Sequence, residues 1–139
     1  MAEIDAVTRA WRAMRELVLD HDRRGAVAEA LGMSFTRAKA LRHVAREPLT
    51  MRELAGALGA DPPYVTLIVD DLEQRGLVTR APHARDRRVK VVAATHAGRA
   101  AAAEADRVLD VPPAALQELA AEDLAALDRI LATLRGAGG

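Results

Sequence analysis

Glycine and proline divide residues 50–95 into short elements, which leaves few folds open to this chain. Thr50 is a good N-cap for a helix, MRELAGALG, that ends at Gly59. Asp61 caps the next helix, and the first two positions of that helix are prolines, where a missing backbone N–H costs nothing. This second helix ends at Gly76. The link between the two helices is therefore tight.

Two short segments rich in β-branched residues follow the second helix. LVTR at 77–80 and VKVVA at 89–93 are separated by the loop APHARDRR, which contains Pro82. This pattern predicts a β-hairpin with a long tip. A helix, a tight link, a second helix and then a hairpin indicate a winged helix-turn-helix, in which the hairpin is the wing.

Positive charge is concentrated in this hairpin. The chain has 20 basic and 20 acidic residues, but residues 75–99 hold 7 basic side chains and 1 acidic one, Asp86. Acidic residues outnumber basic ones on both sides, in 1–74 and in 100–139. A positive field focused in one place can guide a polyanion even when the total charge is zero. A solvated surface loop is the alternative explanation, and the charge pattern alone does not choose between the two.

Helical patterns precede this central module. Apolar residues at steps of three and four predict a helix over 3–22, with a candidate interruption at 23–25 and an end at Gly32. Ser34 is the N-cap of a further helix at 35–46.

Helical patterns also follow the hairpin. Thr95 is the N-cap of a helix over 96–110, and VPP at 111–113 interrupts the chain. The leucine-rich stretch 115–135 predicts one last helix. The fold class expected from these elements is mainly α with a small β-hairpin wing.

Composition limits the class of protein. Half of the residues are hydrophobic and only 2% are aromatic, so the core must be built from aliphatic side chains and alanine, a mixture that favours helices. The chain has no cysteine, which excludes disulfides, thiolate metal sites and cysteine-based redox sensing. No apolar run approaches the ~20 residues that cross a bilayer. The first residues lack the pattern of a signal peptide, so we expect a cytoplasmic protein.

The predicted motif indicates double-stranded DNA as the partner. The second helix of such a motif enters the major groove, and its exposed N-terminus also suits a phosphate. Arginine at the tip of a wing can enter the narrow minor groove. Asp86 can hold the guanidinium of Arg88 extended through an ion pair, while Arg85 and Arg87 point toward phosphates. The candidate DNA-binding residues are Thr50, Arg52, Pro62, Pro63, Tyr64, Thr66, Leu67, Asp70, Arg80, Arg85, Asp86, Arg87, Arg88 and Lys90.

Three stretches carry a resemblance to a known family. They are LTMRELAGALGADPPYVTLIVDDLEQRGLVTR, the Asp-Arg-Arg of the wing at 86–88, and ATHAGRA. On these stretches, residues 33–100 resemble the MarR family of winged-helix transcriptional regulators, and the flanking helices match too. The resemblance implies a bacterial regulator that binds pseudo-palindromic DNA, with repression as the expected mode.

The resemblance also implies a homodimer, with separate parts of the chain for DNA binding and for dimerisation. The expected parts are a single domain over 1–139, a winged helix-turn-helix module at 33–95, and dimerisation helices at 1–31 and 96–136. The apolar stripes Ile4–Val18 and Leu109–Leu134 point to the same partner, because a regular apolar helix face must be buried somewhere.

The sequence departs from the family pattern at two positions of the helix that is expected to contact bases, and these differences affect which DNA sequence it would bind. Leu67 stands where many members have a polar or basic residue, and Pro63 stands where a small polar residue is common. Leu67 and Tyr64 can contact thymine methyl groups, or they can pack on each other one helical turn apart.

The family often binds small aromatic acids or phenols between the dimerisation helices and the DNA-binding module. The residues that could line such an effector pocket here are Trp11, Met14, Arg15, Met33, His43 and Arg46. Arg15 or His43 could pair with a carboxylate. Trp11 and Met14 are at helical spacing, so plain core or dimer interface is the alternative for them.

Other functional classes find less support. Asp20, His21 and Asp22 are metal-ligand types, but neighbours on a helix point in different directions, so no metal site or cofactor is expected. No Ser-His-Asp, paired-carboxylate or glycine-rich phosphate motif indicates an enzyme. The alternative to a regulator is a winged-helix protein–protein interaction module that no longer binds DNA, which the zero net charge and the apolar Leu67 favour. A ligand-binding or metal-buffering protein is a third, remote option.

Overall fold

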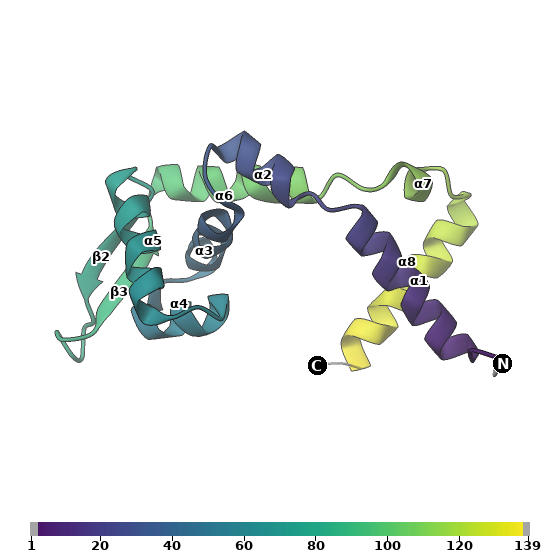
Figure 1. The fold of residues 1–139 in the computed structure, drawn as a ribbon, viewed down its shortest axis with the longest axis horizontal. Coiled ribbons are helices and arrows are strands. Elements are labelled where there is room, and N and C mark those ends of the chain that lie inside the picture. Colours follow the sequence, from purple (N-terminus) through teal and green to yellow (C-terminus); the bar gives the residue numbers. More distant parts are fainter. Residues whose placement is uncertain (1–2, 138–139) are drawn as a thin grey trace.

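Helices and one small antiparallel sheet build the computed structural model, which describes residues 3–137 (Figure 1). The helices are α1 (Ala6–Asp20), α2 (Arg24–Leu31), α3 (Phe35–Arg46), α4 (Met51–Leu58), α5 (Pro62–Gln74), α6 (His96–Leu109), α7 (Ala114–Gln117) and α8 (Ala121–Ala137), and the strands are β1 (Leu49–Thr50), β2 (Val78–Pro82) and β3 (Lys90–Ala94). The expected fold class, mainly α with a small wing, is confirmed. Residues 1–2 and 138–139, at the ends of the expected domain, lie outside the described residues.

The central helices begin and end at the predicted caps. The Thr50 hydroxyl accepts the N–H of Glu53 at 3.1 Å, and the Glu53 carboxylate accepts the N–H of Thr50 at 2.9 Å, a capping box that starts α4. Gly59 ends α4 with a φ of +60°, where a side chain would be strained. Asp61 occupies the N-cap position of α5 but makes no side-chain capping bond, and Pro63 at the second helical position has no N–H to offer it.

The sheet has one strand more than the sequence predicts. β1 pairs antiparallel with β3, placing Leu49 opposite Val92, and the strand order is β1-β3-β2. A strand of two residues has no detectable period, so the prediction of a simple hairpin misses it. β2 begins one residue later than predicted and continues to Pro82, which is tolerated because β2 lies at the edge of the sheet.

The first long helix breaks earlier than predicted. The helix expected over 3–22 ends before His21, and the interruption lies at 21–23 instead of 23–25. The chain turns locally at this point, because the Asp22 carboxylate accepts the backbone N–H of Arg24 at 2.9 Å, two residues on.

The last helix, expected over 115–135, is two helices. α7 and α8 are separated by Glu118–Ala120, where the Leu119 N–H bonds the Leu116 carbonyl at 3.3 Å in a tight turn. The leucines keep their helical spacing on both sides of this turn, so their periodicity hides the break.

The hydrophobic core lies in the central module. One face of α5 is buried, and it is formed by Val65, Ile68, Val69 and Leu72. Leu41 of α3, Leu54 of α4, Val78 of β2 and Val92 of β3 are fully buried beside it. This packing holds α5 with one face against the core and the opposite face free.

The terminal helices contribute nothing to this core. None of the described side chains of α1 and α8 is buried, and Trp11, Val18 and Leu134 expose 59%, 70% and 52% of their surface. Figure 1 shows both helices at the end of the elongated molecule that lies away from the winged-helix module. Apolar faces of this extent mark an interaction surface. No helix within residues 3–137 has the length and apolar character needed to span a membrane.

Gly98 of α6 marks a close approach of two backbone segments. A Cβ built on Gly98 would lie 1.9 Å from the carbonyl oxygen of Leu77, which also accepts the N–H of Thr95. Gly98→Ala is therefore expected to lower the free energy of unfolding by about 3 kcal/mol or more, at the upper end of overpacking costs. Urea denaturation followed by circular dichroism measures this loss.

Gly56→Ala is the matched control within the same module. A Cβ at Gly56 meets nothing within 4 Å, so alanine in this helix should leave stability unchanged or raise it by up to ~1 kcal/mol. Equal stability of the two variants would contradict the packing described for Gly98.

Candidate nucleic-acid interface

The free face of α5 presents the residues that the sequence assigns to a DNA major groove. Pro62, Pro63, Tyr64, Thr66 and Leu67 are all exposed. Tyr64 and Leu67 expose 43% and 61% of their surface, which is high for large apolar side chains. The prediction that these residues point outward is confirmed.

Two features of this face limit its hydrogen bonding. The Thr66 hydroxyl donates to the Pro62 carbonyl at 3.1 Å, so its proton is already used inside the helix. Pro62 and Pro63 have no N–H, and the N–H of Val65 bonds the Asp61 carbonyl. The start of α5 is thus poorer in free donors than the phosphate site that its dipole predicts.

Arg80, at the base of the wing, lies between two carboxylates of α5. Its Nη2 donates to Asp70 Oδ1 at 2.5 Å and to Glu73 Oε1 at 2.9 Å, and its side chain is only 25% exposed. The hydrogen bond from Arg80 holds the pKa of Glu73 below its usual value. Asp70 and Arg80 were both predicted to face DNA, and the structure pairs them with each other. The pair ties β2 to α5 and neutralises charges beside the exposed face.

The tip of the wing is organised by its own hydrogen bonds. Arg88 donates to Asp86 Oδ1 from Nε at 3.2 Å and from its backbone N–H at 3.1 Å, and its side chain is 92% exposed. These bonds, the side-chain one first, lower the pKa of Asp86. The Arg85 N–H donates to His83 Nδ1 at 3.0 Å, and the Val89 N–H to the Asp86 carbonyl at 3.0 Å. The pairing predicted for Asp86 and Arg88 is present.

The remaining candidate residues surround this face. Arg52, Arg85, Arg87 and Lys90 are exposed and make no ion pair within residues 3–137. The Thr50 hydroxyl accepts a hydrogen bond within the α4 capping box. The wing therefore carries free positive charge, whereas the base of the wing does not.

Sequence reasoning misses a second network, which fixes α5 to α3. Asp71 Oδ2 accepts from Arg37 Nε and from Arg75 Nε, both at 2.9 Å, and Arg75 also donates to the Gly32 carbonyl at 3.2 Å. Burial raises the pKa of Asp71, but the hydrogen bonds from Arg75 and Arg37 outweigh it and leave this pKa lowered. The pair Asp71–Arg75 is visible from its spacing of four residues, whereas Arg37 is 34 residues away.

Comparison with known proteins agrees with this geometry. Residues 31–89 match the family model described as MarR family. The chain is similar to the transcriptional regulator BldR from Sulfolobus solfataricus, with 25% identity, a TM-score of 0.63 and coverage of 94% of this chain and 99% of that one. The winged-helix part of the chain is thus similar to the MarR family.

Two further structures share the MarR-family fold. NadR in complex with 4-hydroxyphenylacetate is 22% identical, with a TM-score of 0.64 and coverage of 96% of this chain and 95% of that one. The MepR–DNA complex from S. aureus is 20% identical, with a TM-score of 0.60 and coverage of 91% and 98%.

The effector residues expected from the MarR family lie in different surroundings. Met33 is in the core, whereas Trp11, Met14 and Arg15 lie on α1. His43 and Arg46 line a hollow of about 220 Å³ on α3 together with Lys39 and Arg42. Burial and then the charges of Arg46, Lys39 and Arg42 lower the pKa of His43. The hollow is thus a region of positive potential.

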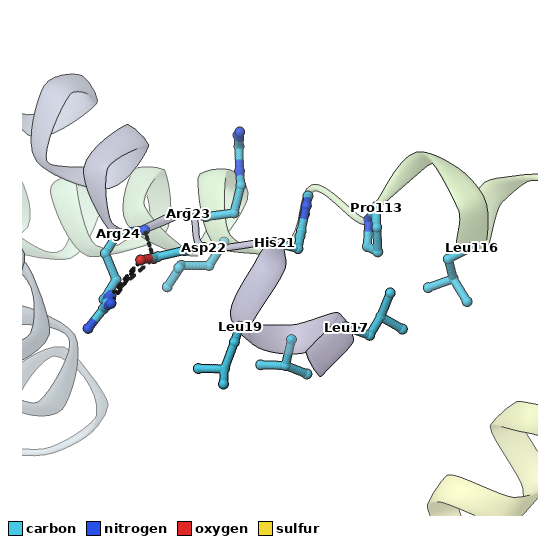
Figure 2. A pocket seen from close by; sticks show the side chains of 10 residues that line it. Leu17, Leu19, His21, Asp22, Arg23, Arg24, Pro113 and Leu116 are labelled. Atoms are coloured by element: carbon cyan, nitrogen blue, oxygen red, sulfur yellow. Dashed lines mark hydrogen bonds and ion pairs between the residues drawn. The ribbon is translucent and has the colours of Figure 1, made fainter. Parts of the chain in front are cut away.

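A larger hollow of about 510 Å³ lies at the joint between the module and the terminal helices (Figure 2). The His21 Nε2–H donates to the Val111 carbonyl at 2.7 Å, and Arg23 Nε donates to the Val108 carbonyl at 3.2 Å. Asp22 pairs with Arg24, whose hydrogen bonds lower the pKa of Asp22 to about 2. These bonds join the two chain segments that connect the module to α1 and α7. In the described part of the chain, no group of three or more His, Asp or Glu side chains could hold a metal ion.

The Asp71 network predicts a specific dependence of stability on pH. Because the pKa of Asp71 is lowered in the folded protein, its ion pairs stabilise the fold above the ordinary value of 3.8, and this contribution is lost as the pH falls through the folded pKa. Asp71→Asn is expected to lower the urea midpoint at pH 7, and the difference from the parent protein is expected to shrink toward pH 3.

Glu29→Gln is the control for the Asp71 measurement, because Glu29 is exposed on α2 and makes no ion pair among the described residues. A difference for Asp71→Asn that stays constant between pH 7 and pH 3 would show that the network does not carry this stability.

Proposed function

We propose that this protein is a homodimeric repressor that binds a pseudo-palindromic operator in double-stranded DNA. The observation that carries the proposal is the combination of an exposed face of α5 with a wing that Arg80 ties to α5 and whose tip carries unpaired positive charge. A winged helix-turn-helix needs this arrangement, because the helix reads the major groove while the wing reaches the neighbouring minor groove. The MepR–DNA complex supports the proposal as a DNA-bound member of the same fold.

In the proposed complex, α5 reads base edges through Tyr64, Thr66 and Leu67, with Pro62 and Pro63 at the groove wall. Arg88 enters the minor groove, held by Asp86, where the phosphates on both walls deepen the negative potential. Arg52, Arg85, Arg87 and Lys90 meet phosphates, which sets the affinity and its salt dependence. Thr50 lies at the start of α4 near the backbone. Asp70 and Arg80 act indirectly, by holding the wing at its angle to α5.

The proposed dimer forms through α1 and α8 and the end of α6, within the expected ranges 1–31 and 96–136. The exposed Trp11, Val18 and Leu134 support this assignment, because a second copy offers the same apolar faces in return. Two modules at 33–95 then face the same side of a duplex, with their half-sites about one helical turn apart. The operator is therefore pseudo-palindromic, and an occupied operator near a promoter excludes polymerase. The protein acts in the cytoplasm, where the bacterial chromosome is accessible.

A small aromatic acid or phenol is proposed to release the repressor. NadR, which was solved with 4-hydroxyphenylacetate, supports such a ligand class for this fold. The positive hollow around His43 and Arg46 suits a carboxylate. Trp11, Met14 and Arg15 lie on α1 and Met33 is buried in the core, so these four residues do not line this hollow within one subunit. The ligand can weaken DNA binding only by the difference between its affinities for two dimer conformations, which differ in the spacing of the two α5 helices.

A second candidate function is a protein–protein interaction module without DNA binding. The exposed apolar Leu67 and the zero net charge favour it. The salt dependence of binding distinguishes the two functions. Each phosphate contact adds about 0.9 to the steepness with which log K falls against log salt. A protein partner held by the apolar face of α5 would give a shallow slope.

Arg88→Ala tests the proposed role of the wing. Loss of the minor-groove arginine is expected to weaken operator binding by about tenfold. With one Arg88 from each subunit, the salt slope should fall by about 2. Fluorescence anisotropy with labelled duplex measures both quantities. Lys39→Ala, which removes a cation from the hollow on α3 and lies outside the proposed DNA and dimer surfaces, is the control. Unchanged affinity and slope in Arg88→Ala would remove the wing from the interface.

Asp86→Ala distinguishes a positioning role from a simple charge effect. Removing an acid beside DNA should strengthen binding if only net charge matters. Because Asp86 holds Arg88 extended, we expect weaker binding instead, by about threefold to tenfold. Asp86→Ala should have no further effect in the Arg88→Ala background. Stronger binding by Asp86→Ala alone would contradict the positioning role.

A further inference from the structure

The free face of α5 is apolar where a helix in the major groove needs donors to read guanine. Residues 61–73 contain no lysine, arginine, asparagine or glutamine. The side chains that project furthest are Tyr64 and Leu67, with 43% and 61% of their surface exposed. They are three residues apart and so lie on the same side of the helix. Bidentate recognition of guanine by arginine or lysine, or of adenine by asparagine or glutamine, is thus not available on α5 before its last residue, Gln74, which lies at the opposite end of the helix from Tyr64.

Two polar side chains on the same face already form a hydrogen bond or an ion pair within the protein. The Thr66 hydroxyl proton bonds the Pro62 carbonyl, which leaves the methyl group and an acceptor oxygen toward solvent. The Asp70 carboxylate is held by Arg80. The phenol hydroxyl of Tyr64 is the one remaining side-chain donor among residues 61–73. A single donor at the edge of an apolar patch cannot distinguish the four base pairs.

Contact between Tyr64 and Leu67 does not explain the patch. If these side chains packed mainly on each other, the pairing would cover Leu67, yet Leu67 keeps 61% of its surface exposed. The fold gains nothing from leaving a leucine and a tyrosine in water beside a basic wing. The nearby unpaired charges of Arg85, Arg87 and Lys90 suit a polyanion, so the occupant of this patch must combine an apolar surface with surrounding phosphates.

The thymine methyl group is the apolar feature of the DNA major groove. We propose that α5 selects its operator by contact of Leu67 and Tyr64 with thymine methyl groups, so that each half-site carries adjacent T·A pairs where these side chains enter. This inference rests on the proposed DNA-binding function and specifies how that function reads sequence. Leu67 supplies the closest contact and is the specificity-determining residue.

Replacement of thymine by deoxyuridine tests this inference, because it removes the methyl group and leaves base pairing unchanged. Duplexes that bind the full-length protein would first be selected from a random library. Each thymine of the half-site would then be replaced in turn, and affinity measured by anisotropy. At the thymines under Leu67, we expect a loss of about fourfold per methyl, from ~0.8 kcal/mol for each buried carbon. Replacement outside the half-sites is the control and should have no effect.

Variants of Leu67 identify the side chain responsible. Leu67→Ala should bind thymine and deoxyuridine duplexes equally, whereas Leu67→Met, which keeps an apolar side chain of similar reach, should retain most of the preference. Position 67 is exposed, so both variants are expected to fold, and a thermal melt of each variant checks this. An unchanged affinity on deoxyuridine, or a preference that survives in Leu67→Ala, would overturn the inference while leaving DNA binding in place. Failure to select any duplex would overturn the proposed function as well.

Discussion

The ion pairs of Arg80 with Asp70 and Glu73 hold together the two elements that we propose read DNA. Arg80 comes from β2 and both carboxylates from α5, so one guanidinium sets the wing against the recognition helix. The second network, around Asp71, fixes the other side of α5 to α3. A surface ion pair alone contributes little, but linked pairs that span three elements restrict their relative angle. Without that restriction the wing and the helix could not meet two adjacent grooves at once.

The same ion-pair networks explain how a protein with zero net charge can attract a polyanion. Three acids of α5 lie close to the surface that we propose meets DNA, where unpaired carboxylates would repel phosphates. Arg37, Arg75 and Arg80 pair with them, so these six charges largely cancel within the protein. Positive charge remains free at the wing tip, in Arg85, Arg87 and Lys90. The distribution of charge, and not its sum, therefore determines which partner this surface attracts.

Features that depend on near neighbours could be predicted from the sequence, and features that depend on distant ones could not. The caps at Thr50 and Thr95, the buried stripe of α5 and the Asp86–Arg88 pair each arise within a few residues. The strand β1 is too short to have a pattern, and the break before α8 is hidden by leucines that stay in phase. The pair Arg37–Asp71 and the bond from His21 to Val111 join residues 34 and 90 positions apart, so only the folded chain reveals them.

The role of Arg80 shows that prediction from the sequence has the same limit at the candidate nucleic-acid interface. Its position in a basic segment predicts a contact with DNA, but the chain brings it to two acids that precede it by seven and ten residues. Local charge counts treat every arginine of residues 75–99 alike, whereas the structure separates those that are paired from those that are free. This separation reduces the positive charge available for phosphates to the tip of the wing and to Arg52.

The salt dependence of binding by the unmodified protein tests the central claim, that α5 and the wing form one DNA-reading surface in a dimer. Anisotropy would be recorded for a selected palindromic duplex and for a scrambled one over a series of salt concentrations. We predict one dimer per palindrome, tighter binding to the selected duplex, and a fall of log K against log salt with a slope between about −4 and −9, from the four unpaired basic residues and Arg88 in each subunit. Weak binding that is equal on both duplexes, with a shallow slope, would contradict it.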